Sequence, residues 1–183
     1  MKLYKIYSRA IGLLFALSLL CVGCENEDIL DINDLEISPS NPESVVIVEP
    51  DDGITSVNAL TKAINENGDA TYILRRDGVY YMEGKNVFKH NVVIKAENGS
   101  GKMPIIQPIC DAQGALNADM IRLEGSATFE NIYIIGKDAA TGNLMQRLFR
   151  IDESNVRLKF DNCFIDHCRN FCIRTDNVNN KIY

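Results

Sequence analysis

The chain has 183 residues and a formal net charge of −6, which is unevenly distributed along the sequence. Residues 25–53 hold ten acidic residues and no lysine or arginine, whereas residues 54–183 hold sixteen basic and fifteen acidic residues. A domain this close to neutral, without a dominant basic stripe, argues against a nucleic-acid-binding role.

The first 23 residues have the features of an export signal. A basic stretch at residues 2–9 precedes an apolar run at 10–20 that is too short to span a bilayer. Cys24 then follows a small residue and precedes strongly polar sequence, a pattern that resembles a lipobox. We therefore expect that Cys24 is lipidated, becomes the first residue of the mature protein and anchors it to the outer membrane. A signal peptide cleaved elsewhere, or an uncleaved anchor, is the alternative.

Residues 24–53 have the composition of a solvated tether, because they are acidic and contain interspersed proline and serine. The start of this tether, residues 24–28, resembles the acidic signal that sends lipoproteins of Bacteroidota-type bacteria to the outer face of the outer membrane. A charged spacer is an equally open interpretation. A short strand is predicted at residues 45–48, and the folded domain is expected to occupy residues 54–183.

One helix is predicted, at residues 56–67, from its apolar spacing and its end signals. Its apolar face consists of Val57, Leu60 and Ile64. Ser56 or Thr55 can cap the first turn, and Gly68 ends the helix. Because the terminal repeat of a stacked structure exposes its core, an amphipathic helix is expected to lie across that end and cover it.

Strands dominate the rest of the chain and are separated by turns that contain glycine. The strands predicted after the helix are at residues 71–74, 79–82, 91–95, 105–108 and 120–123. Further along, Val156, Leu158 and Phe160 alternate with polar residues, which is the two-residue period of a strand. The domain is therefore expected to be all-β.

The second half of the domain contains a repeated sequence. A Phe-acid-Asn motif begins at Phe129 and again at Phe160, 31 residues later. Self-similarity with a period of this length is typical of solenoids. The inward–outward alternation changes phase at the asparagines, as expected where one strand turns a corner into the next. Asn131 and Asn162 are therefore predicted to stack and to hydrogen-bond through their amides.

Residues 129–134 and 160–165, with their asparagine corners, resemble right-handed parallel β-helix proteins of the pectate-lyase-like group. Residues 68–74, 77–80 and 91–99 resemble the entry coil of the same group. Within it, the nearest resemblance is to uncharacterised lipoproteins of Bacteroidota-type bacteria. The resemblance implies a right-handed parallel β-helix, with the predicted helix as its N-terminal cap.

The coils are expected to stack with Phe149 beside Ile121, and with Phe171 beside Phe149, all pointing inward. The outer face then carries a row of cations, with further cations nearby: Arg122, Arg150, Arg157, Lys159 and Arg174. Because guanidinium groups bind carboxylates and sulfates in a bidentate manner, these residues are candidates for binding an acidic polysaccharide. The alternative is that Glu124 and Asp152 neutralise the row and the face is merely solvated.

Residues 166–169 contain one of only two histidines in the chain. A Cys–His catalytic pair is disfavoured, because adjacent residues in a strand or tight turn point apart. A metal site formed by Cys163, His167, Cys168 and Cys172 is also disfavoured, because the spacings differ from a zinc knuckle and Cys163 takes a core position. The cysteines that remain open to disulfide formation, since export exposes the chain to oxidising conditions, are Cys110, Cys168 and Cys172.

Lyases of the resembling group abstract an acidic sugar proton with a Lys or Arg base, while Ca²⁺ or Arg neutralises the carboxylate. No such base can be assigned to a position of this sequence. Calcium is implied by the resemblance alone, since Asp138, Asp152, Asp161 and Asp166 show no clustered loop pattern. No catalytic residue, metal or other cofactor is therefore expected. The favoured function is a non-catalytic, polysaccharide-associated or structural module at the outer membrane, and the alternative is a lyase that cleaves acidic glycans by β-elimination.

The final residues, 176–183, are polar and are predicted to stop partway into a third asparagine corner. Because nothing after Phe171 is expected to cover the last coil, we expect that the chain is marginally stable and self-associates through that end, or that it is a truncated version of a longer β-helix. A longer reading frame with more asparagine-cornered coils would favour the lyase hypothesis.

Overall fold

The structure, a computed structural model, describes residues 44–176 and 179–183. This part of the chain is mostly β, with one helix, α1, and three sheets in which all paired strands are parallel. The predicted β class is therefore confirmed. The expected export signal, the lipidation site Cys24 and the tether up to residue 43 lie outside the described residues.

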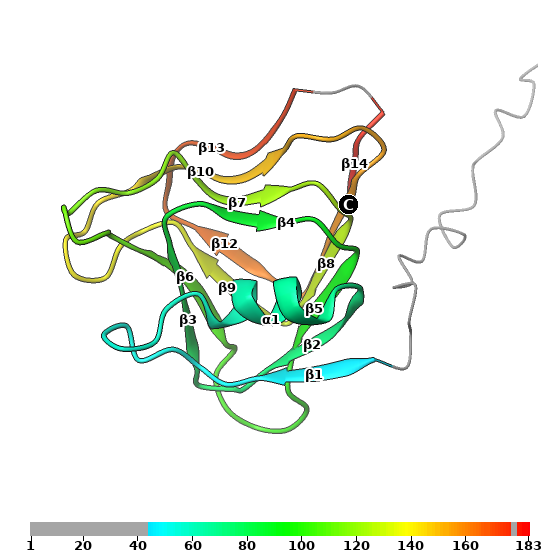
Figure 1. Cartoon of the computed structure of the whole chain (residues 1–183), viewed down its shortest axis with the longest axis horizontal. Coiled ribbons are helices and arrows are strands. Elements are labelled where there is room, and N and C mark those ends of the chain that lie inside the picture. The colour runs from blue at the N-terminus through cyan, green and yellow to red at the C-terminus, as the bar shows by residue number, and fades with distance from the viewer. Residues whose placement is uncertain (1–43, 177–178) are drawn as a thin grey trace, which may run out of the picture. The chain divides into compact units, whose positions relative to one another are not determined.

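The strands of each sheet are not consecutive along the chain. The six-stranded sheet has the order β1 (Val45–Val48), β2 (Ala70–Leu74), β5 (Val92–Ala96), β8 (Ala127–Glu130), β11 (Arg157–Asp161) and β14 (Lys181–Ile182). The β4–β13 sheet contains β4 (Asn86–Phe88), β7 (Asp119–Leu123), β10 (Met145–Ile151) and β13 (Cys168–Thr175). The β3–β12 sheet contains β3 (Val79–Glu83), β6 (Ile105–Ile109), β9 (Tyr133–Ile135) and β12 (Phe164–Asp166). From β2 onward, every third strand returns to the same sheet (Figure 1).

The strands predicted between residues 71 and 123 are present, each within one residue of its predicted ends. β1 matches the strand predicted at 45–48, and it pairs with β2. The sequence analysis places the start of the folded domain at residue 54. The six-stranded sheet begins earlier, at β1. β4 has no counterpart among the predicted strands, because three residues are too few to display a two-residue period.

Aromatic side chains from successive strands stack in the interior. Phe129 and Phe160 occupy equivalent positions on β8 and β11, and their ring centroids are 5.6 Å apart. Phe149 from the β4–β13 sheet meets both rings edge-on, at 5.3 and 5.4 Å. Phe129 and Phe149 are fully buried, and Phe160 is partly buried against the same core. Burying such a side chain is worth about 1.5–3 kcal/mol, so the repeated Phe motif contributes directly to stability.

The predicted asparagine stack is confirmed. Asn162 Nδ2 donates a hydrogen bond to Asn131 Oδ1 at 2.7 Å. Both residues have positive φ angles, 48° for Asn162 and 58° for Asn131. Asparagine adopts this left-handed backbone more readily than most residues, so it suits the corners between β8 and β9 and between β11 and β12.

The helix begins three residues later than predicted, because α1 spans Ala59–Asn67. The Asp52 carboxylate accepts the N–H groups of residues 54–56 and holds them in a turn, so neither Thr55 nor Ser56 acts as the helix cap. The N-cap residue is Asn58, whose side chain makes no capping hydrogen bond, and the Asp51 carboxylate accepts the N–H of Ala59 at 3.2 Å.

The end of α1 and its buried face agree with prediction. Gly68 has a φ of 72° and donates its N–H to Ile64 O, which ends the helix. Leu60 and Ile64 are fully buried. The helix contacts β1, β2, β3 and β4, which are the first strands of the three sheets (Figure 1). It therefore covers the core at that end.

The predicted stacking is wrong in the last strand of the β4–β13 sheet. Phe149 lies beside Ile121 as predicted, but its other neighbour is Ile173 and not Phe171. The register of β13 against β10 differs from the predicted one by two residues. A β-bulge in the first half of β13, which is one residue longer than the facing part of β10, accounts for one of them. Phe171 therefore lies beside Arg147 and is 61% exposed, so it does not point inward.

The last asparagines form a different corner from the predicted one. β14 pairs with the beginning of β11, so that Lys181 lies beside Arg157. Asn179 precedes β14 as Asn155 precedes β11, and both have positive φ angles, 71° and 63°. Residues 181–182 therefore extend the six-stranded sheet. They lie beside the residues that precede Phe160, so they come before the place where a third Phe-acid-Asn corner would form.

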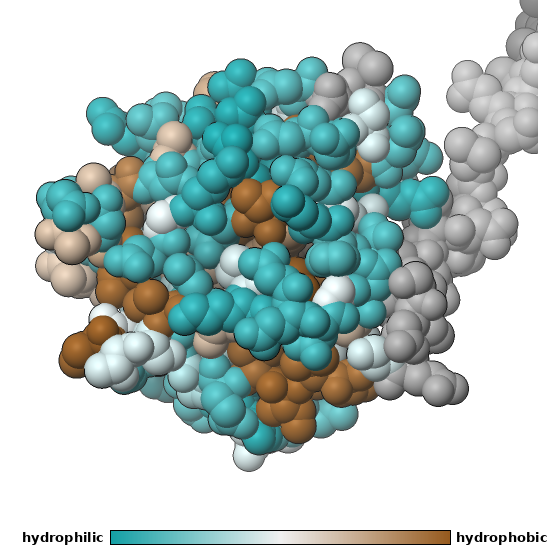
Figure 2. All heavy atoms as spheres, in the orientation of Figure 1, coloured by the Kyte–Doolittle hydropathy of each residue, from teal (hydrophilic) through white to brown (hydrophobic). Residues whose placement is uncertain are grey.

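The two sides of the molecule seen in Figure 2 differ in polarity. Hydrophilic residues cover β10 and β13, whereas hydrophobic residues are exposed over β1 and β2. Val45 and Ile47 of the edge strand β1 are among the exposed hydrophobic residues. The charged surface over β10 and β13 is the one that contains the predicted cation row.

Candidate functional site

The predicted cation row lies on the outer face of the β4–β13 sheet. Arg122, Arg150 and Arg174 occupy equivalent positions on β7, β10 and β13. The stacking predicted from sequence places Cys172 beside Arg150, but the register of β13 differs from that prediction by two residues, so Arg174 takes this position instead. Like charges on neighbouring strands destabilise a sheet, so the row requires compensating carboxylates.

Asp119 provides the central compensation. Its side chain is fully buried and forms an ion pair with Arg147. The same carboxylate lies 3.0 Å from Arg122 and 3.9 Å from Arg150. The buried Asp119 carboxylate is surrounded by three guanidinium groups, and its ion pairs with arginines of β10 link the first residues of β7 to β10.

Two further aspartates bridge the arginines across strands. Asp152 lies 2.7 Å from Arg150 and 3.4 Å from Arg122. Asp176 lies 2.8 Å from Arg174 and 3.2 Å from Arg150. The hydrogen bond from Arg174 is the main cause that holds the pKa of Asp176 below its usual value. An incoming carboxylate would therefore have to displace an existing ion pair at every arginine of the row.

The other two predicted cations do not join this row. Arg157 and Lys159 belong to β11 of the six-stranded sheet, and Lys181 of β14 lies beside Arg157. A pocket of about 390 Å³ opens there, lined by Asn155, Arg157, Asn179, Asn180 and Lys181. The candidate polysaccharide-binding residues are thus divided between two sheets.

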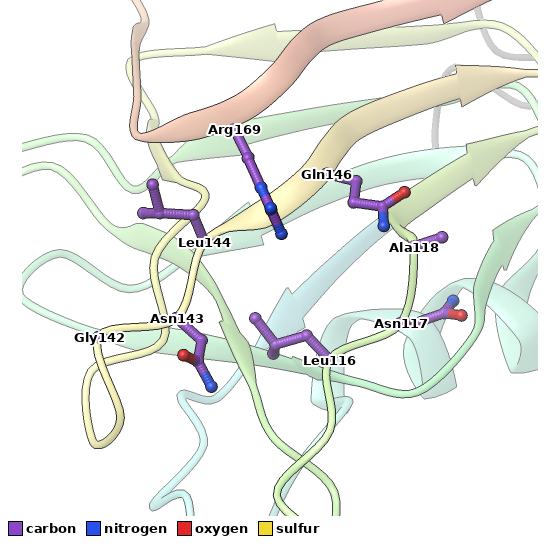
Figure 3. Close-up of a pocket in the computed structure, with 8 residues that line it drawn as sticks. All are labelled: Leu116, Asn117, Ala118, Gly142, Asn143, Leu144, Gln146 and Arg169. Carbon is purple, nitrogen blue, oxygen red and sulfur yellow. The ribbon is translucent and has the colours of Figure 1, made fainter.

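A larger pocket, of about 510 Å³, lies where β7, β10 and β13 begin. Its walls are the loop before β7, the loop before β10 and the bulged part of β13. The lining residues are Leu116, Asn117, Ala118, Gly142, Asn143, Leu144, Gln146 and Arg169. In Figure 3 the Arg169 side chain projects between the wall that carries Leu116 and the wall that carries Leu144. We call this cavity the Arg169 pocket.

Aspartates within the two loops fix the walls of the Arg169 pocket. In the first loop, the Asp111 carboxylate accepts the N–H groups of Gln113 and Ala115 at 3.0 and 2.8 Å. In the second, the Asp138 carboxylate accepts the N–H and the hydroxyl of Thr141 at 2.8 and 2.7 Å. Each aspartate replaces water as the partner of loop backbone groups, so the walls are organised before a ligand arrives.

Asp138 also connects the two loops. Burial alone raises the pKa of Asp138, but hydrogen bonds from Thr141 and from Cys110 of the first loop outweigh burial and leave that pKa below its usual value. The Cys110 sulfur lies 3.6 Å from the Thr141 hydroxyl. Lys137 and Leu144 form an antiparallel bridge that closes the second loop. The ionised form of Asp138 is therefore the one that stabilises this wall.

Arg169 is the charged group of the pocket. Its guanidinium group has no ion pair or hydrogen bond to any group that the structure describes, and none of the eight lining residues is acidic. Asn117 Nδ2 donates to Asp119 O at 3.1 Å, which leaves the Asn117 amide oxygen as an acceptor. Asn143 and Gln146 add two more carboxamides, and each carboxamide can both donate and accept. The pocket therefore offers one cation and several neutral polar groups.

The sequence analysis covers residues 166–169 only as a possible Cys–His pair or metal site, and it does not select Arg169 as a binding residue. Its neighbours in the pocket come from residues 116–118 and 142–146, which no local motif connects to it. The available signal is the long loop before β10, because loops on a rigid scaffold commonly carry binding residues.

The remaining candidates have ordinary environments. His167 Nδ1 lies 2.9 Å from Asp166 Oδ2 on the surface. Within residues 44–176 and 179–183, no group of three or more His, Cys, Asp or Glu side chains is arranged to hold a metal ion. Cys110, Cys163, Cys168 and Cys172 are free thiols. Among the described residues, no helix combines the length and the apolar character needed to cross a membrane.

No protein-family model matches the chain. No curated protein matches it in sequence either. The family resemblance drawn from the β-helix motifs therefore stays a prediction, and the function proposed next is inferred from the residues of this chain.

Proposed function

We propose that this chain is an outer-membrane lipoprotein, anchored through lipidated Cys24, whose folded domain binds an acidic saccharide without cleaving it. We further propose that the domain is a right-handed parallel β-helix and that the binding site is the Arg169 pocket. The acidic tether would separate the binding domain from the membrane.

The order of the strands supports the β-helix. From β2 to β14 the chain passes in turn through the six-stranded, β3–β12 and β4–β13 sheets, and all strand pairs are parallel. Successive passes correspond to the coils of a β-helix, and α1 lies across the first of them. Crossover connections between parallel strands are right-handed in nearly all proteins, which gives the proposed hand.

The observation that carries the binding proposal is the contrast between Arg169 and the arginine row. Arg122, Arg150 and Arg174 each lie within 3.5 Å of an aspartate oxygen. Arg169 lies in a pocket whose lining contains no carboxylate. An anionic ligand therefore gains a new ion pair at Arg169, whereas at the row it only exchanges one partner for another.

The rest of the lining matches the chemistry of a sugar acid. A guanidinium group binds a carboxylate through two parallel hydrogen bonds. The carboxamides of Asn117, Asn143 and Gln146 can donate to and accept from sugar hydroxyl groups. Leu116 and Leu144 supply apolar surface for the C–H face of a sugar ring. The volume of about 510 Å³ lies within the usual range for small-ligand sites.

The alternative, a lyase, needs two functions in one cleft. One group must neutralise the substrate carboxylate, and a second must accept the proton beside it. Arg169 can fill either role, but the other seven lining residues are Leu, Asn, Ala, Gly and Gln, which provide no second cation and no ionisable base. For this reason we favour binding over β-elimination at this pocket.

The test uses acidic oligosaccharides of defined length, such as oligogalacturonates, in calorimetric titrations and in an absorbance assay for unsaturated product. Arg169→Ala should weaken binding about tenfold to a hundredfold, because a hydrogen bond to a charged group is worth about 1.5–3 kcal/mol. Arg174→Ala is the matched control, since it removes an equal charge from the same strand at a position already paired with Asp176. Unsaturated product from the wild type would refute the non-catalytic proposal, and equal affinities for Arg169→Ala and wild type would refute the site.

A further inference from the structure

The smaller pocket contains two cations on neighbouring strands. Arg157 of β11 and Lys181 of β14 are paired in register, on parallel strands about 4.8 Å apart. Both line the cavity of about 390 Å³, which we call the Arg157 pocket. Leu158, the next residue of β11, is fully buried, so Arg157 faces outward. Like charges directly opposite each other destabilise a sheet, and an anion bound between them removes that repulsion.

Among the described residues, no carboxylate pairs with either cation. The Arg157 guanidinium and the Lys181 ammonium have no ion pair within this part of the chain, and the other three lining residues are asparagines. The arginine row of the β4–β13 sheet differs in this respect, because Asp152 bridges Arg122 and Arg150. The Arg157 pocket therefore offers two adjacent positive charges to an external anion.

The same three-residue pattern forms both layers of the Arg157 pocket. An asparagine, one further residue and a cation follow one another at residues 155–157 and again at 179–181. Asn155 and Asn179 have positive φ angles, 63° and 71°, and both line the pocket. Because the two strands are parallel and in register, the second copy of the pattern lies beside the first. Each cation is thus accompanied by a carboxamide, which can donate to and accept from a ligand.

Asn180 and Ser126 hold the backbone around the pocket in place. The Asn180 carboxamide accepts the N–H of Val156 at 3.0 Å and donates to the Thr175 hydroxyl at 2.7 Å. The Ser126 hydroxyl accepts the N–H of Arg157 at 3.1 Å. These hydrogen bonds connect the start of β11 to β8, to the end of β13 and to the residue before β14. The strands that carry the two cations are therefore fixed before a ligand binds, which lowers the entropy cost of binding.

We propose that the Arg157 pocket binds a dianionic phosphate group, either as inorganic phosphate or as a phosphate monoester of a sugar. A phosphate monoester carries nearly two negative charges at neutral pH and presents three acceptor oxygens. Arginine binds two such oxygens in parallel, and lysine acts as a point charge beside a third. A sugar carboxylate carries one charge and would leave one of the two cations unpaired. The inference therefore goes beyond the proposed function, because it assigns a second site with a different ligand.

The two pockets lie at opposite ends of β13. Arg169 is the second residue of this strand, and Thr175, which the Asn180 side chain contacts, is the last. Six residues of extended strand span about 20 Å. Figure 1 places β14 beyond the last residues of β13, away from its beginning near β12. Because distant substitutions act independently, a change in one pocket should leave the ligand of the other pocket bound.

An NMR titration of the full chain, labelled with nitrogen-15, tests the site at mildly alkaline pH and constant ionic strength. The probes are glucose 6-phosphate, inorganic phosphate, and glucose 6-sulfate, which has a similar shape and one charge fewer. Glucose 6-phosphate should shift the backbone amide signals of Arg157 and Lys181 to saturation. It should also bind more tightly than glucose 6-sulfate, because only the phosphate ester carries a charge for each cation.

Two variants remove the cations one at a time. Arg157→Gln and Lys181→Gln should each weaken the binding of glucose 6-phosphate about tenfold or more, because each removes a charge-assisted contact. Lys95→Gln is the matched control, since it removes a cation of the same sheet that does not line the pocket. Unchanged amide signals elsewhere in the spectrum show that a variant is folded, and either glutamine variant alone is sufficient for the test.

The outcomes separate this inference from the proposed function. Saturable shifts that weaken in the glutamine variants and persist in Lys95→Gln and Arg169→Ala support the inference. Within that result, inorganic phosphate that binds as tightly as the ester identifies the free ion as the ligand, and tighter binding of the ester identifies a sugar phosphate. An absence of saturable shifts, equal affinities for the phosphate and sulfate esters, or equal effects of Arg157→Gln and Lys95→Gln would overturn it. The oligogalacturonate titrations decide the proposed function separately, whichever of these results is found.

Discussion

Replacement of Asp119 by asparagine tests whether the arginine row is a structural ion-pair network. The substitution keeps the shape of the side chain and removes the charge that faces Arg147, Arg122 and Arg150. Removing one partner of a buried ion pair costs about 3–5 kcal/mol, because the remaining charge is left unpaired. Arg147 retains only 13% exposure, whereas Arg122 and Arg150 are more exposed and have other carboxylate partners. We therefore expect a loss near the lower end of that range, about 3 kcal/mol.

Denaturant unfolding monitored by circular dichroism provides the measurement. Asp119→Asn should lower the midpoint and leave the slope unchanged, which marks a change in stability and not in the size of the unfolding unit. Asp176→Asn is the matched control: its side chain is 38% exposed at the edge of the same network, so its effect should be small and should fade with added salt. Equal midpoint shifts for the two variants would refute a network organised around the buried Asp119.

Three further predictions concern the core, the pocket wall and the anchor. Phe129→Ala should cost about 3–5 kcal/mol in the same unfolding assay, whereas Phe164→Ala, whose side chain is 61% exposed, should be nearly silent; the reverse order would mean that the register is wrong. Asp138 has a lowered pKa in the folded protein, so its contribution to stability should be complete above the ordinary aspartate pKa and disappear as the pH falls through the lower folded value. Asp138→Asn should therefore reduce the loss of unfolding free energy between neutral and acidic pH, and an unchanged loss in this variant would contradict the prediction. Cys24→Ala should release the protein from membranes in a fractionation experiment, and undiminished membrane retention would count against lipidation.

Residue-level periodicity predicts much of this fold. Apolar stretches bounded by turns that contain glycine place β2, β3, β5, β6 and β7 to within one residue. The Phe-acid-Asn repeat predicts the contact between Asn131 and Asn162, since identical residues at equivalent corners must lie one above the other. These features depend on local sequence alone.

The errors arise where one local detail shifts everything after it. The register of β13 differs from the predicted one by two residues, and one of these comes from a bulge that has no compositional signal. The difference moves Ile173 into the position predicted for Phe171 and aligns Arg174 with Arg150. The start of α1 differs from prediction because Asp51 and Asp52 compete with Ser56 for the same backbone groups. Sequence alone does not rank such competing hydrogen bonds.

The Arg169 pocket is beyond sequence reasoning for a different reason. Its walls are loops from two passes of the chain, and its cation comes from a third. Arg169 resembles the other arginines in sequence and differs from them only in having no acidic neighbour, which is a property of the folded chain. The arginine row is the opposite case: it looks like an anion-binding surface in the sequence but is neutralised in the folded chain. Asp119 and Asp176 provide this neutralisation from positions that the strand pattern does not identify as neighbours of the row.

The most direct test of the account is a thermodynamic cycle that combines Arg169→Ala with removal of the ligand charge. The affinities of wild type, Arg169→Ala and Arg174→Ala are measured for an oligogalacturonate and for its carboxyl-reduced, neutral analogue of equal length. If Arg169 binds the carboxylate, wild type and Arg174→Ala should prefer the acidic ligand about tenfold or more, and Arg169→Ala should lose that preference. An equal preference in all three proteins, or no preference in the wild type, would contradict the assignment of the pocket as an acidic-saccharide site.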